Sequence, residues 1–254
     1  MRAVFFSHRG NKRRKNEDAL LVSGCVVSEA LMESPAVVFS DRRNALLVVA
    51  DGMGGYEGGA LAARMLVLSL LERFGGEESV DETELRNVLC EVAGRMKATA
   101  ALDGSLGGMG TTFAGLAARE EGVCVFNCGD CRVYRFHGGY LDKLSRDHSV
   151  VQELVDSGTI TEEEMRTHPR KNMVTSAVQV NADMSMAPLF FKNIPAAGGE
   201  KFFICSDGVW EALPLTELEE CLGAEDMLKG CDELGRKLLE TDCEDNVAFV
   251  FAEI

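Results

Sequence analysis

The sequence lacks a long hydrophobic run, because no apolar stretch approaches the roughly 18 residues that suggest a membrane-spanning helix. The short apolar stretch 3–6 precedes a strongly basic segment, which is the reverse of the order in a signal peptide. Nine cysteines occur without a regular framework spacing, and this favours reduced thiols over a set of disulfides. We therefore expect a cytoplasmic protein without a membrane span.

Basic residues are also few in comparison with acidic ones. The chain has 26 Lys and Arg against 41 Asp and Glu, and its formal net charge of −15 opposes nucleic acid or an anionic membrane as the main partner. It contains no internal repeat and no low-complexity linker. Its 254 residues, 46% of them hydrophobic, are enough for one large domain or two small ones, and we expect a single domain over 1–254.

The apolar pattern predicts strands and helices in separate blocks. Asp81 is expected to cap one helix, and 28–43 is expected to be a polar excursion. Helices are expected over 58–73, 82–102, 149–170, 214–222 and 224–240, and strands over 3–8, 19–27, 46–50, 111–118, 122–128, 131–136, 139–144, 173–179, 184–191, 200–205 and 246–252. This segregation predicts an α+β fold in which two antiparallel sheets pack face to face with helices outside.

Four aspartates lie in contexts that suit metal binding. Asp51 and Asp207 follow apolar runs, Asp245 precedes one, and Asp130 lies in the sequence CysGlyAspCysArg. A carboxylate at the end of a strand points into a crevice rather than into solvent, and several such ends would form a cage of hard oxygen ligands. These ligands favour Mg²⁺ or Mn²⁺ over zinc. A cage of this kind most often serves phosphate chemistry.

Six short motifs occur in a fixed order along the chain. They are Arg13 to Asp18, Asp51 to Gly55, Gly108 to Thr112, Asn127 to Arg132, Cys205 to Gly208 and Asp245 to Val247. Each motif is weak alone, whereas six in this order and spacing are specific. The series resembles the metal-dependent serine/threonine protein phosphatases of type 2C, especially their bacterial branch, from about residue 5 to residue 251.

The resemblance implies a four-layer α-β-β-α sandwich of two antiparallel sheets flanked by helices, with a mobile flap subdomain at about 149–180. It implies a binuclear Mn²⁺ or Mg²⁺ centre with two tight sites and a weaker third. The partners implied are phosphorylated proteins, together with a bacterial serine/threonine kinase whose action the enzyme reverses.

The same resemblance assigns ligands to the two tight sites. Asp51 should bridge the two ions, and the carbonyl group of Gly52 should ligate one of them. Asp207 and Asp245 should hold the first ion, and Glu17 should hold the second, partly through water.

Three further residues complete the implied site. Asp18 should orient ligands and waters, Arg13 should bind the substrate phosphate, and Asp130 should hold the third ion together with Asp207. An arginine fork suits phosphate oxygens and keeps its charge. Water between two cations becomes a strong nucleophile, and no Ser-His-Asp or Cys-x5-Arg arrangement is evident, so no covalent intermediate is needed.

Three positions depart from the family pattern. Met53 stands where many eukaryotic members carry a histidine, so another group must protonate the leaving alkoxide. Cys131 replaces the usual serine beside Asp130. Gln179 stands where relatives usually have glycine, which puts the hinge of the flap in question.

Plainer interpretations apply to several residues outside the implied site. Cys124, Cys128 and Cys131 fit buried thiols better than a zinc site. His148 fits a structural hydrogen bond, while His168 is a weak candidate proton donor. Trp210 is expected to pack in the core. The basic cluster Arg9, Lys12, Arg13, Arg14 and Lys15 could also be a solvated loop or a nucleic-acid patch, although the acidic chain as a whole opposes the latter.

The function expected is hydrolysis of phosphoserine and phosphothreonine in proteins. Two alternatives stay open at this point. One is a metal-dependent phosphatase of small phosphorylated metabolites, because substrate choice depends on the surface and the flap. The other is an inactive regulatory module, against which stands the presence of every acidic ligand that the family pattern requires.

Overall fold

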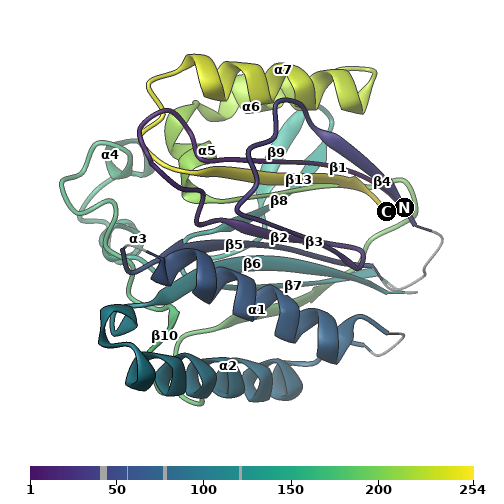
Figure 1. The fold of residues 1–254 in the computed structure, drawn as a ribbon. Helices are drawn as coiled ribbons and strands as arrows, with labels where there is room; N and C mark the ends of the chain where they lie inside the picture. The colour runs from purple at the N-terminus through teal and green to yellow at the C-terminus, as the bar shows by residue number, and fades with distance from the viewer. Residues whose placement is uncertain (41–44, 56, 77–78, 120–121) are drawn as a thin grey trace.

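The computed structural model describes residues 1–40, 45–55, 57–76, 79–119 and 122–254. Two antiparallel sheets lie face to face, and helices cover both outer faces (Figure 1). The first sheet has the order β4 (Ala36–Phe39), β1 (Arg2–His8), β13 (Val247–Glu253), β12 (Lys201–Cys205), β8 (Arg132–His137) and β9 (Tyr140–Lys143). The second has the order β11 (Phe190–Ile194), β7 (Gly122–Cys128), β6 (Gly110–Arg119), β5 (Leu46–Met53), β2 (Ala19–Val22) and β3 (Cys25–Ser28), with β10 (Val178–Gln179) beside β6.

Apolar residues on both faces of the central strands produce this layering. The run Leu46 to Ala50 in β5 is buried throughout, as a strand covered on both faces requires. Its inward residues, such as Leu47 and Val49, meet Ile204 and Val250 of the other sheet in a core between the two sheets. The sequence-based prediction of an α+β fold with two packed antiparallel sheets is confirmed.

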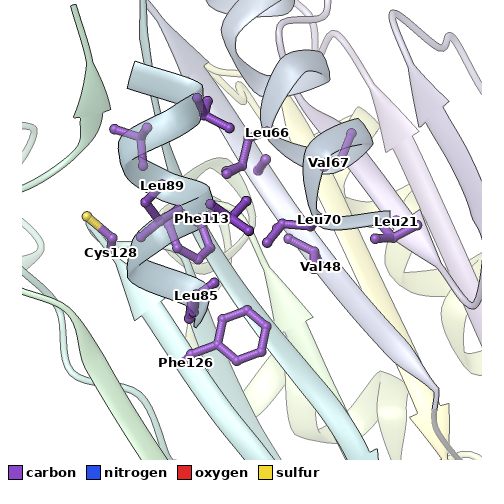
Figure 2. Packing of buried hydrophobic residues seen from close by; sticks show 14 of the residues in the cluster. Leu21, Val48, Leu66, Val67, Leu70, Leu85, Leu89, Phe113, Phe126 and Cys128 are labelled. Carbon is purple, nitrogen blue, oxygen red and sulfur yellow. The ribbon is translucent and has the colours of Figure 1, made fainter. Parts of the chain in front are cut away.

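Long helices bury the outer face of the second sheet. Helices α1 (Gly58–Phe74) and α2 (Glu82–Leu102) place apolar residues such as Leu66 and Leu89 against Phe113 and Phe126 (Figure 2). The predicted cap of α2 is also present, since the Asp81 side chain accepts a hydrogen bond from the Glu84 amide at 3.0 Å. A short 3₁₀ helix, η1 (Gly104–Leu106), follows α2.

The other outer face is covered by α5 (Asp207–Ala212), α6 (Leu215–Leu222) and α7 (Met227–Glu240). Leu234 and Leu238 of α7 pack with Phe6 and Phe249 of the first sheet. The four-layer α-β-β-α sandwich is thus complete. No helix in the described ranges combines the length and apolar character needed to cross a membrane.

Several segments differ from the sequence-based expectation. The range 149–170 is not one helix but two short ones, α3 (Val150–Asp156) and α4 (Glu162–Met165). Gly158 has a φ of 70°, which ends the first helix, and a capping box between Thr161 and Glu164 starts the second. The predicted strand 173–179 contracts to β10, and the predicted strand 184–191 is shifted to β11, because turns occupy most of its first half. The predicted strand 19–27 is divided into β2 and β3 by a turn at Ser23 and Gly24, both of which have positive φ.

The expected polar excursion 28–43 contains strand β4, while 41–44 lie outside the described residues. Helix α5 was not predicted, because its Asp-Gly start reads as a turn. Figure 1 shows α3, α4 and the start of α5 at one end of the sandwich, and both chain termini at the other.

Candidate metal centre

Six predicted acidic residues lie where strands end or begin. Asp51 is in the last part of β5, Asp207 begins α5 directly after β12, and Asp245 shortly precedes β13. Glu17 and Asp18 immediately precede β2, and Asp130 lies in the turn between β7 and β8. The fold therefore brings these residues, which are far apart in the sequence, to one region, where the charges of Asp207 and Asp245 raise the pKa values of their neighbours.

Asp18 lies at the back of this region and is only 1% exposed. Its Oδ2 accepts a hydrogen bond from the Ser206 hydroxyl at 2.9 Å, whereas its Oδ1 has no partner among the described residues. Burial and then the charge of Asp207 raise its pKa well above the usual range. Ser206 was not singled out from the sequence, although its position in the motif CysSerAspGly was a signal.

Asp51 and Asp207 form the centre of the group. Burial, followed by the charges of Asp245 and Glu211, raises the pKa of Asp207 to about 7, while a side-chain hydrogen bond with Asp51 opposes the rise. Burial and the charge of Asp207 raise the pKa of Asp51 well above its ordinary value. Two carboxyl groups in such contact share a proton, and a cation that both groups bind would replace this proton. Oδ1 of Asp207 also has no partner among the described residues.

Asp130 is buried, with 4% of its surface exposed. Burial, followed by the charge of Asp207, raises its pKa. Gly129 allows the turn before it, because its φ of 102° is one that side chains rarely adopt. The structure therefore places Asp130 close enough to Asp207 for their charges to interact, while the weaker third site stays a prediction.

Arg13 and Asp245 contact each other directly. The Arg13 Nη2 donates to Asp245 Oδ2 at 2.6 Å, and this hydrogen bond raises the pKa of the guanidinium. The Arg13 side chain is 54% exposed and Asp245 30%. Glu17 lies nearby, and its pKa is raised by burial, against the opposing charge of Arg13. The predicted phosphate-binding residue and two predicted metal ligands thus face one space.

Asn246 holds this arrangement together and was missed as a site residue. Its Oδ1 accepts from the Glu17 amide at 2.8 Å. Its Nδ2 donates to the carbonyl oxygens of Arg9 and Lys15 at 3.0 and 2.9 Å. The loop that carries Arg13 is therefore fastened to the start of β13. A polar residue between Asp245 and an apolar strand was the available signal.

Close packing of the backbone around Gly52 and Gly59 holds the loop of Glu17 against β5 and α1. A Cβ atom on Gly52 would lie 2.2 Å from the Gly59 carbonyl oxygen and 2.6 Å from that of Glu17. A Cβ on Gly59 would lie 2.8 Å from Oε2 of Glu17. The absence of side chains at these positions lets β5, α1 and the Glu17 loop meet.

The donor set fits a hard divalent cation. In the described part of the chain, no three His, Cys, Asp or Glu side chains yet converge as ligands of one ion would. Asp245 is instead turned to Arg13, and Asp51 contacts Asp207. Buried, mutually repelling carboxylates with unpartnered oxygens on Asp18 and Asp207 are nevertheless the groups that such an ion stabilises.

A cleft of about 640 Å³ opens beside this centre. Its lining combines the loop that carries Arg13, the start of α5 and the segment around Lys171. The ion pair between Lys171 and Glu211 joins that segment to α5. The range predicted as a flap therefore borders the cleft, while its mobility stays a prediction.

The other residues considered from the sequence are hydrogen-bonded to the backbone or buried in the core. The Nδ1 of His148 accepts from the Gly129 amide at 3.1 Å, and the Nδ1 of His168 accepts from the Arg170 amide at the surface. Trp210 is buried in the core, as expected. The three cysteines under consideration are buried and free, and burial raises the pKa of Cys124 and Cys128 to about 11.

Comparison with known proteins identifies the class to which this fold and site belong. A family model described as protein phosphatase 2C matches residues 35–236. The serine/threonine phosphatase stp of Listeria monocytogenes is 30% identical over all of this chain and 96% of its own length. The chain therefore belongs to the protein phosphatase 2C family, the metal-dependent serine/threonine phosphatases, as the sequence motifs predicted.

Solved structures agree with this assignment. The Mycobacterium tuberculosis serine/threonine phosphatase PstP/Ppp superposes with a TM-score of 0.82 at 25% identity, covering 100% of this chain and 99% of that one. The catalytic domain of PstP in complex with two manganese ions shares the fold, with a TM-score of 0.78, 24% identity, and coverage of 100% of this chain and 99% of that one.

Proposed function

We propose that this protein hydrolyses phosphoserine and phosphothreonine in other proteins at a binuclear Mn²⁺ or Mg²⁺ centre. The observation that carries the proposal is the group of buried carboxylates around Asp51 and Asp207, which lies beside a cleft lined by Arg13. The named activity of relatives such as stp supports the same reaction.

We assign the ligands as the family pattern implies. Asp51 and the carbonyl group of Gly52 would help to hold both ions, Asp207 and Asp245 would hold the first, and Glu17 would hold the second, partly through water. When bound, the ions would supply the attacking water, neutralise the phosphate oxygens and, at a weaker third site, provide the proton for the leaving group.

Two further acidic residues have supporting roles in this assignment. Asp130 lies beside Asp207 and would hold the weaker ion with it. Asp18 would orient ligands and waters from behind, since Ser206 already fixes one of its oxygens. Met53 carries no acidic proton, because its sulfur is a thioether, so this assignment leaves it out of proton transfer.

Arg13 would bind the phosphate of the substrate. Its guanidinium now donates to Asp245, a contact that ligation of an ion by Asp245 would weaken. The freed fork would then face the cleft, where it can take two phosphate oxygens. Its side chain is 54% exposed, so the surrounding chain does not enclose it.

We further propose that the substrates are proteins and that the enzyme opposes a bacterial serine/threonine kinase in the cytoplasm. The names of the relatives support protein substrates, and the free cysteines suit a reducing compartment. The cleft is large enough for a peptide segment around the phosphorylated residue.

The test compares phosphoserine and phosphothreonine peptides with small phosphate esters, using the purified protein with Mn²⁺ or Mg²⁺. We expect higher kcat/KM for the peptides and complete loss of turnover after chelation. Turnover that persists after exhaustive chelation would reject the metal mechanism. A clear preference for small phosphorylated metabolites would instead establish the metabolite phosphatase.

A further inference from the structure

The single tryptophan of the chain joins two elements of the acidic centre. Trp210 lies on α5, three residues after Asp207, and is 5% exposed. Its indole Nε1 donates a buried hydrogen bond of 3.1 Å to the carbonyl oxygen of Asp130. One hydrogen bond therefore connects the helix that begins at Asp207 to the turn that carries Asp130.

This bond acts on a turn that needs external support. Gly129 has a φ of 102°, and the position of its missing Cβ is only 2.3 Å from the Thr112 Cβ. His148 fixes Gly129 from one side, by accepting from its amide and by donating its own amide to the Gly129 carbonyl. Trp210 fixes the next residue, Asp130, from α5. The carboxylates of Asp130 and Asp207 repel each other, so their spacing depends on such bonds.

Arg132 fixes the orientation of the indole. Its guanidinium carbon lies 3.5 Å from the centroid of the Trp210 ring. The same guanidinium donates to Asp147 Oδ2 at 2.6 Å and to the Tyr134 hydroxyl at 3.2 Å. The side chains of Arg132 and Asp147 are 11% and 1% exposed, so this cation–π contact is largely desolvated. Cation–π contacts are strongest when water is excluded from them.

The pair is enclosed by the chain around it. The Met165 sulfur lies 3.6 Å from Nη2 of Arg132. Arg166 donates to the carbonyl oxygens of Glu211 and Leu213, which follow Trp210 in the chain. These contacts hold the indole with its N–H directed at the carbonyl oxygen of Asp130.

We propose that Trp210 and Arg132 are positioning residues that set the placement of Asp130 relative to Asp207. Trp210 acts through its hydrogen bond to Asp130, and Arg132 acts through the Trp210 ring. The proposal rests on the proposed function only in treating Asp130 and Asp207 as ligands of the weaker ion. The placement itself can be measured without any ion.

Two substitutions separate the parts of this device. Trp210→Phe keeps an aromatic ring and removes the N–H donor. Arg132→Met keeps the aliphatic part of the side chain and removes the guanidinium group that stacks on Trp210. If loss of the partner of Asp147 prevents folding, Arg132→Lys replaces this variant. Arg135→Met is the matched control, because Arg135 lies on the same strand, over the Phe202 ring at 5.6 Å and paired with Glu200 at 3.1 Å.

The first measurement is amide hydrogen exchange of the metal-free protein. We expect residues 129–131 to exchange roughly three- to tenfold faster in Trp210→Phe and in the Arg132 variant, the effect of losing one hydrogen bond. Arg135→Met should leave this turn unchanged. Unchanged exchange in Trp210→Phe would overturn the proposal.

The second measurement is a Mn²⁺ titration by calorimetry, accompanied by Trp210 fluorescence in the proteins that retain it. We expect the weak-site affinity to fall roughly three- to tenfold in Trp210→Phe and the Arg132 variant, with the tight sites unchanged. A lower melting temperature with unaltered weak-site affinity, or a wild-type isotherm without a weak site, would reject the proposal. Absence of phosphopeptide hydrolysis by the wild type would reject the proposed function but not the exchange result.

Discussion

Arg13 is the residue whose role changes most with the state of the site. In the structure its guanidinium neutralises Asp245 at 2.6 Å, and in the proposed reaction it faces the substrate. A single permanent cation can serve both because it lies on an exposed loop held by Asn246. The contact with Asp245 thus limits the negative charge of the centre when no cation is bound.

The first prediction concerns this arginine. Arg13→Ala should raise KM for a phosphopeptide and lower kcat/KM by about 30- to 150-fold, corresponding to roughly 2–3 kcal/mol for a lost charge-assisted contact. Tight Mn²⁺ binding should persist, because Asp245 loses a competitor. Lys12→Ala is the control, since Lys12 pairs with Asp242 and Glu244 at the exposed rim. Equal kinetics for wild type and Arg13→Ala would remove Arg13 from the site.

The second prediction concerns the leaving group. Asp130→Asn should reduce kcat for phosphoserine by about a hundredfold, the usual scale of lost proton donation. An aryl phosphate, whose leaving group needs little protonation, should lose far less. Steady-state rates for both substrates, measured against Mn²⁺ concentration, give the ratio. If both substrates slow equally and the melting temperature drops, Asp130 serves only the turn.

At the scale of elements, the site depends on contact between α1 and the loop before β2. Gly59 of α1 leaves space for Glu17, whereas a Cβ atom added to Gly94 of α2 would have no neighbouring atom within 4 Å. The two glycines occupy helices that cover the same sheet, yet only the first lies against the acidic centre. They form a natural matched pair.

The third prediction uses this pair. Gly59→Ala should lower the free energy of unfolding by about 1–3 kcal/mol and weaken one tight Mn²⁺ site, because its methyl group overlaps the Glu17 carboxylate. Gly94→Ala should instead raise the free energy of unfolding by about 0.5–1 kcal/mol, as expected for an exposed helical glycine. Urea unfolding with and without Mn²⁺ measures both effects. Stabilisation by both substitutions would show that Glu17 moves freely.

The elements also show what the sequence could predict. Strands such as β5 were found because five consecutive apolar residues, buried on both faces, leave few alternatives. The acidic ligands were found through the order of the motifs. The role of Asn246 was not found, because its partner Glu17 is 229 positions away and such a contact leaves no local pattern. Helices α3 and α4 were merged in the prediction, since charge and periodicity continue across Gly158.

At the scale of the molecule, the two sheets concentrate negative charge at one end of the sandwich. Burial and mutual repulsion raise the pKa values of Asp18, Asp51 and Asp130, and that of Asp207 to about 7. The metal-free folded protein therefore retains protons that the unfolded chain releases near pH 4. Its stability should decrease as pH rises from about 4 through 7. A bound cation replaces these protons and removes the penalty.

The last prediction tests this balance with a reversal of sign. In the presence of chelator at pH 7.5, Asp51→Asn should melt a few degrees above the wild type, because asparagine avoids the cost of keeping a proton on this buried carboxyl group. In saturating Mn²⁺ the order should invert, since ligand binding adds about 2.7 kcal/mol at a hundredfold excess over Kd and the variant has lost its bridging ligand.

Asp142→Asn, on the exposed part of β9, is the control and should shift neither melting temperature. Scanning calorimetry of the three proteins in chelator and in Mn²⁺ supplies the comparison. The reversal distinguishes a carboxylate kept for a cation from one kept for the fold, because a structural carboxylate stabilises the protein with or without the ion. Asp51→Asn melting below the wild type in both conditions would assign Asp51 to the fold and leave the proposed bridge without support.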